Sequence, residues 1–77
     1  IKVNHFILDL ADRLAQPPVV EGYDIVQLDS QTLQVGISGE KGFNQLFLEL
    51  TRQGISVTSM KNKSNRLESL FLDLVGG

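Results

Sequence analysis

Few side chains in this sequence have the types and spacing that catalysis requires. A nucleophile must lie within reach of a tuned base, and the chain has one histidine, His5, and no cysteine. The hydroxyl side chains are scattered through turns and strands, so the sequence places none of them beside His5. His5 also lacks the HxxxH or HExxH spacing that puts two metal ligands on one helix face. We therefore expect a structural or solvent-exposed histidine, no catalytic residues and no metal site.

Carboxylates and glycines provide two further candidates. Two carboxylate pairs are close enough in sequence to be considered for acid–base chemistry: Asp9 with Asp12, and Asp24 with Asp29. Surface carboxylates more often only solvate a fold, which is the role we expect here. The stretch "GISGEKG", residues 36–42, lacks the GxxxxGK[ST] spacing of a phosphate-binding loop. It is typical of a helix start, whose free amides attract an anion only weakly, so we expect no cofactor in these residues.

A basic cluster and two leucines are the candidates for an interaction surface. The stretch "MKNKSNR" contains Lys61, Lys63 and Arg66. It is either a solvated loop or a docking surface for an acidic protein face or lipid headgroups. Leu48 and Leu72 each lie about 140° around a predicted helix from the first residue of its apolar stripe. Either a neighbouring element covers these leucines or they contribute to a partner-binding surface.

Length and composition limit the classes of protein that remain. The 77 residues suffice for one domain, since chains of this size bury only about 60% of their unfolded surface. The net charge is -2 and no long basic run is present, so we expect no nucleic-acid partner. No apolar run approaches the roughly 20 residues that span a bilayer. The first residue is Ile1 rather than Met, which suggests a piece excised from a longer protein.

The segment "YDIVQLDSQTLQVGIS", residues 23–38, predicts a β-hairpin. Two runs of β-favouring residues flank the turn-forming letters "DSQ". In the second run, Leu33, Val35 and Ile37 alternate with polar or small residues, which is the period of a strand with one buried face. We expect these three side chains to point into the core.

A helix and a further strand are expected next. The helix covers residues 41–53 and ends at Gly54, which can adopt the left-handed conformation. Its apolar stripe occupies positions i, i+3, i+4 and i+7: Phe43, Leu46, Phe47 and Leu50. The run "ISVTSM", residues 55–60, is rich in β-branched residues and predicts a strand. Alternation places two pairs on opposite faces: Ile55 with Val57, and Thr58 with Met60.

A second amphipathic helix is expected after that strand. It begins at Asn65, which forms a capping box with Glu68, and it ends at Gly76. Its stripe is Leu67, Leu70, Phe71 and Leu74. The two stripes lie in similar stretches, "FNQLFLEL" and "LESLFLDL". One repetition cannot build a solenoid, which needs about three units, so shared helix packing explains the similarity better than a duplicated site.

Residues 4–15 admit two interpretations. In "VNHFILDLADRLAQPP" the apolar residues match helical spacing, with Asn4 as a cap and the prolines beyond the end. The same letters also allow a strand with Phe6, Leu8 and Leu10 on one side, followed by a loop through the prolines. The spacing alone favours a helix.

The stretch "GISVTSMKNKSNRLESLFLDLV", residues 54–75, resembles the C-terminal accessory domain of ATP-binding subunits of bacterial ABC-2-type exporters. Those subunits end with a short strand and then a helix that carries a Leu-Glu-x-x-Phe motif, which Leu67, Glu68 and Phe71 match. The resemblance extends upstream through the hairpin and the first helix, over residues 6–75, with decreasing specificity.

The resemblance implies a strand at the N-terminus, so we expect residues 5–10 to be β against the helical periodicity. The expected fold is then α+β, a small, mostly antiparallel sheet with two packed helices in the order β-β-β-α-β-α. It also implies that residues 1–77 are a single non-catalytic domain of an ABC transporter ATP-binding subunit, supporting the assembly or regulation of export. The family's phosphate-binding loop and other ATP-binding parts have no match in this sequence, so ATP and Mg are expected only in an upstream domain.

The partners that the resemblance implies are the chain's own upstream ATPase domain, a second ATPase subunit in a homodimer, and a membrane permease subunit. The location implied is the inner face of the cytoplasmic membrane. In that setting Glu68 caps a helix while Leu67 and Phe71 anchor it in the core. The surface residues expected to make contacts are Leu48, Lys61, Lys63, Arg66 and Leu72. The alternative function is a free-standing regulatory domain that senses a small molecule, by analogy with other compact α+β domains.

Overall fold

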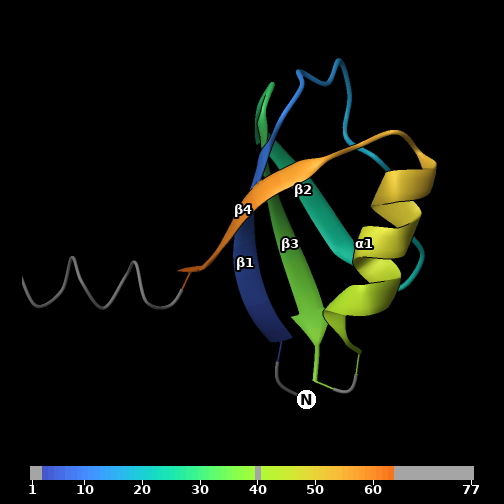
Figure 1. The fold of residues 1–77 in the computed structure, drawn as a ribbon. Helices are drawn as coiled ribbons and strands as arrows, with labels where there is room; N and C mark the ends of the chain where they lie inside the picture. Colours follow the sequence, from blue (N-terminus) through green and yellow to red (C-terminus); the bar gives the residue numbers. More distant parts are fainter. Residues whose placement is uncertain (1–2, 40, 64–77) are drawn as a thin grey trace, which may run out of the picture.

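A computed structural model describes residues 3–39 and 41–63 as a four-stranded antiparallel sheet with a helix on one face (Figure 1). The elements in chain order are β1 (Val3–Leu10), β2 (Asp24–Asp29), β3 (Thr32–Ser38), α1 (Phe43–Arg52) and β4 (Val57–Asn62). The strands lie in the order β2-β3-β1-β4, so β1 is central and β2 and β4 are at the edges. The face that packs against α1 is called the inner face here, and the opposite face the outer face.

β1 confirms the strand expected for residues 5–10 and settles the choice between strand and helix. It pairs with β3 on one side and with β4 on the other, so its backbone polar groups form hydrogen bonds in both directions. Leu8 and Leu10 are buried on the inner face, while Ile7 is 8% exposed on the outer face. Because this central strand buries residues on both faces, its apolar residues are not strictly alternating, and their spacing imitates that of a helix.

The hairpin of β2 and β3 is confirmed. The Asp29 carboxylate accepts a hydrogen bond of 2.8 Å from the backbone N–H of Gln31, which closes the turn between the strands. Leu33 and Val35 are fully buried and Ile37 is 5% exposed, so the predicted core face of β3 is correct.

α1 begins and ends close to the predicted positions, with Gly42 as its N-cap and Gln53 as its C-cap. Gly54 has a φ of +78°, the left-handed conformation that favours glycine. Its N–H donates to Thr51 O, and the next N–H, that of Ile55, donates to Leu50 O. These two bonds define a Schellman motif, which ends the helix and directs the chain back toward the sheet.

β4 is a strand, as expected, but its faces differ from the prediction. Leu10 is paired with Val57 and Leu8 with Met60, so both partners lie on the inner face. Thr58 is the extra residue of a β-bulge between them, and its hydroxyl donates to Asp9 O at 3.1 Å. The predicted separation of Val57 from Met60 is therefore wrong, because the bulge reverses the alternation along this strand.

The expected pair of packed helices is also wrong. The described chain is a four-stranded antiparallel sheet with a single helix, in the order β-β-β-α-β. Leu46 and Leu50 of α1 are fully buried against the sheet, and the connection between β1 and β2 adds Val20 and Tyr23 to the same core. One helix and one connecting segment thus close this core. The second helix expected from Asn65 lies outside the described residues.

The packing of α1 predicts that truncating two leucines of this helix to alanine will lower the free energy of unfolding by different amounts. Leu46→Ala should lower the free energy of unfolding by about 2–5 kcal/mol, because Leu46 is fully buried and its truncation leaves a cavity. Leu48→Ala removes the same atoms from a side chain that is 55% exposed, and should change stability by less than about 0.5 kcal/mol. Denaturant unfolding monitored by circular dichroism measures both. Equal costs for the two variants would contradict this orientation of α1.

Candidate functional site

The candidate catalytic groups do not come together. His5 is exposed on the outer face, where its ring packs over Gly36. Asp24 is paired with Gly36 and Asp29 with Thr32, which puts these two carboxylates at opposite ends of β2. Within residues 3–39 and 41–63, no group of three or more His, Asp or Glu side chains is placed to hold a metal ion.

The remaining candidate carboxylates either form hydrogen bonds within the fold or are exposed to solvent. Asp9 accepts a hydrogen bond from the Ser59 hydroxyl across the β1–β4 pair, while Asp12 is exposed in the following connection. The hydrogen bond from the backbone of Gln31, aided by the Thr32 hydroxyl, lowers the pKa of Asp29 below its ordinary value. The same hydrogen bonds hold the ionised carboxylate in the turn, which gives Asp29 a structural role.

A groove lined by both apolar and hydroxyl-bearing side chains runs between α1 and β4. Its volume is about 400 Å³, and its floor and walls come from the last turns of α1, the following turn and β4: Phe47, Thr51, Ile55, Ser56, Val57, Thr58, Ser59 and Met60. Four of the eight lining residues carry hydroxyl groups and none is charged, so the groove offers apolar surface together with hydrogen-bonding groups.

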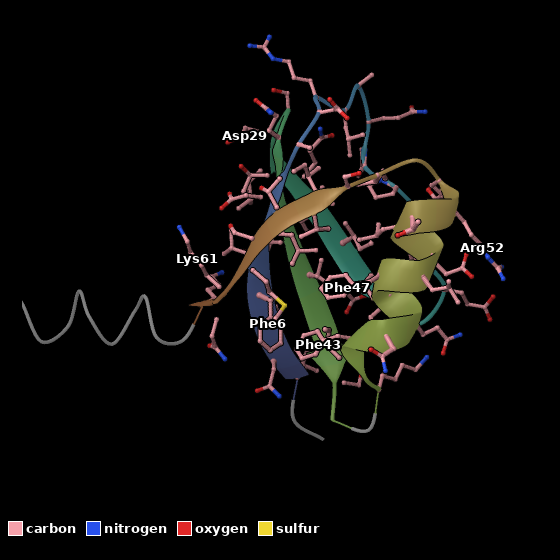
Figure 2. The ribbon with its side chains drawn as sticks, viewed as in Figure 1. Phe6, Asp29, Phe43, Phe47, Arg52 and Lys61 are labelled. Carbon is pink, nitrogen blue, oxygen red and sulfur yellow. The ribbon has the colours of Figure 1, made fainter. Side chains whose placement is uncertain are left out.

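An aromatic cluster adjoins this groove. The rings of Phe6 and Phe43 meet edge to face with centroids 4.9 Å apart, and those of Phe43 and Phe47 are stacked at 6.1 Å. Figure 2 shows the three rings coming from β1 and α1 and lying between the sheet and the helix. All three are partly buried, whereas Leu46 and Leu50 of the same predicted stripe are fully buried. The sequence identified these phenylalanines as apolar but not their partial exposure, which depends on the rotation of α1 over the sheet.

The basic residues lie on the outer face. Lys61 is level with Ile7, and Lys63 extends from the end of β4 across β1 to donate to Gln34 Oε1 at 2.9 Å. Among the described residues the one ion pair is Arg52 with Glu49 on α1, so neither lysine has a carboxylate partner there. Lys61 and Lys63 therefore lie near the end of β4, and neither forms an ion pair among the described residues.

The structure describes one of the remaining predicted contact residues, Leu48. Leu48 is 55% exposed on the solvent side of α1, away from the sheet, so it lies on the opposite side of the molecule from Lys61 and Lys63. Leu48 is therefore uncovered within the described structure. Five other residues of the predicted motif and surface lie outside the described residues: Arg66, Leu67, Glu68, Phe71 and Leu72.

No model of a known protein family matches the chain, and no solved structure gives a significant match to it. In the part of the chain that the structure describes, no helix is long and apolar enough to cross a membrane.

The exposure of the groove can be measured through Met60, the chain's single methionine, which is 40% exposed at its edge. Hydrogen peroxide should convert Met60 to its sulfoxide in the folded protein at a rate comparable with that in the denatured chain, because oxidation follows access to the sulfur. Intact-mass spectrometry at timed intervals gives both rates. Strong protection in the folded protein, lost in denaturant, would show that the groove is covered.

Proposed function

We propose that this chain is a non-catalytic C-terminal domain of an ABC transporter ATP-binding subunit, which supports the assembly or regulation of ATP-driven export across the cytoplasmic membrane. The proposal rests on the resemblance over residues 54–75. The observation that favours it most is the Schellman turn at Gly54, which joins α1 to β4 at the start of that stretch. The order β1-β2-β3-α1-β4 follows the first five elements that the resemblance implies.

In this proposal the domain acts by contact, and the chemistry belongs to other parts of the complex. ATP and Mg bind in the upstream ATPase domain, whose phosphate-binding loop has no counterpart here. Leu48, on the solvent side of α1, contacts that upstream domain. The membrane permease and a second ATPase subunit complete the complex at the inner face of the membrane.

The coding sequence upstream of Ile1 provides the first test of this proposal. It should encode an ATPase domain with a GxxxxGK[ST] loop, because the proposed parent subunit hydrolyses ATP. Sequencing the gene around this segment decides the matter. A start codon directly before the codon of Ile1, with no phosphate-binding loop encoded upstream, would contradict the export proposal. It would favour the free-standing regulatory domain.

A second test examines Leu48 in the intact parent subunit. Leu48→Ser should change the rate of ATP hydrolysis while the melting temperature of this domain stays close to wild type, because the side chain is exposed and contributes little to the core. Val19→Ser, at a position that is 86% exposed on the connection before β2, is the matched control and should leave the rate unchanged. Equal rates for wild type and Leu48→Ser would remove this contact from the proposal.

A further inference from the structure

β4 forms one edge of the sheet. It is paired with β1 on one side, and no described strand lies on its other side. On β1, the N–H of Leu10 points to β3, where it donates to Gln31 O. These directions alternate along an antiparallel strand, so Leu8 also bonds toward β3, and its partner Met60 directs its own N–H and C=O away from β1. Within the described chain these two groups of Met60 have no backbone partner.

The groove between α1 and β4 lies along this same edge. Its lining includes Met60 from the inner face and Ser59, the partner of Asp9, from the outer face. A hollow beneath the sheet would contact only inner-face side chains, so a hollow lined by residues of both faces lies beside the strand. A further strand would sit about 4.8 Å from β4. Its inward side chains would then enter the groove against Phe47 and Met60.

Lys61 gives this edge a positive charge on the outer face. Figure 2 shows its side chain directed away from α1, and it forms no ion pair among the described residues. Lys63, by contrast, extends over β1 to Gln34. Asp9, which lies one strand further in, accepts a hydrogen bond from the Ser59 hydroxyl. Lys61 is therefore the cation placed to face a residue that is added beyond β4.

We propose that β4 binds an extended segment of a partner protein, which adds to the sheet as an antiparallel fifth strand. The partner residue opposite Met60 exchanges two backbone hydrogen bonds with it and places an apolar side chain in the groove. The next partner residue lies opposite Lys61 on the outer face and is acidic, since opposite charges on facing residues stabilise a strand pair. The segment therefore has the pattern apolar, acidic, apolar.

The edges of the sheet differ in their suitability for this partner. Asp24 and Asp29 lie at the two ends of β2, where they would repel an acidic segment. On β4, the bulge at Thr58 and the charge of Lys61 are features that limit pairing between identical edges. They leave the regular part of β4, residues 59–62, to a partner of complementary charge. The inference rests on the described strands and does not depend on the proposed role in export.

Peptide binding to the full chain, followed by fluorescence anisotropy, tests the proposal. The probe is a labelled peptide of alternating valine and threonine, in which glutamate replaces one central threonine. Wild type should bind it saturably, and added salt should weaken the binding. Lys61→Glu should weaken it by about three- to tenfold and should favour a peptide with lysine in place of the glutamate.

Amide hydrogen exchange locates the bound peptide. The glutamate peptide should slow exchange at Met60, because the Met60 N–H gains an acceptor, and should leave the outward-facing amides of β2 unchanged. The same peptide with N-methylated valines should not bind, because it cannot donate to Met60 O. Arg52→Glu is the matched control: it reverses a charge on the exposed side of α1 and should bind both peptides as wild type does.

Four results would overturn the proposal. The first is no binding at peptide concentrations up to about 1 mM, the weak end of the affinity scale. The second is equal binding of the glutamate and lysine peptides, and the third is unchanged binding of the N-methylated peptide. The fourth is exchange at Met60 that slows as protein concentration rises without peptide, which would assign this edge to a second copy of the chain. None of these results bears on the export proposal, which concerns the gene and the intact subunit.

Discussion

The position of β1 at the centre of the sheet is the constraint on which the rest of the structure depends. Its hydrogen bonds to β3 and β4 hold together a hairpin and a later strand that are distant in sequence. Its side chains also pack on both faces of the sheet. Leu8 is fully buried under α1 on the inner face, and Ile7 is buried on the outer face. If this segment were a helix, β4 would have no described strand to pair with, and the groove beside it would not exist.

The two faces that β1 separates have different physical characters. The inner face is apolar, and α1 with the preceding connection covers its centre but leaves the groove and aromatic cluster beside β4. The outer face carries polar and charged side chains around Ile7, among them Asp24 on β2, Asp9 on β1 and Lys61 on β4. Within residues 3–39 and 41–63, no three His, Asp or Glu side chains come together on either face to hold a metal ion. The proposed role beside an ATPase would use such a domain only for its contact surfaces.

Local patterns in the sequence were sufficient for the elements that form from neighbouring residues. The alternation of Leu33, Val35 and Ile37 and the glycine at position 54 each specify a structure within a few residues, and both predictions are correct. β1 was harder, because its periodicity favours a helix and only the family resemblance favoured a strand. Ile7, buried on the outer face, interrupts the alternation of Phe6, Leu8 and Leu10 on the inner face, so β1 has no clean period of two.

Features that arise from pairing between distant segments could not be predicted. The bulge at Thr58 depends on the register of β4 against β1, and the sequence of β4 alone does not predict it. The hydrogen bond from Lys63, which follows β4, to Gln34 of β3 spans the intervening strand β1, and no local pattern around Lys63 indicates it. The expectation of two packed helices failed for a related reason, since an amphipathic pattern indicates that a face will be buried but not what it packs against.

Amide hydrogen exchange, followed by NMR on the native protein, tests the central position of β1 most directly. Amides of β1 from Phe6 to Leu10 and those of β3 should exchange slowest, at the rate set by global unfolding, because each of these strands is paired on both sides. The outward-facing amides of β2 and β4 should exchange faster through local opening. Exchange in β1 that is as fast as in those edge strands, or helical connectivities across residues 4–15, would contradict the account.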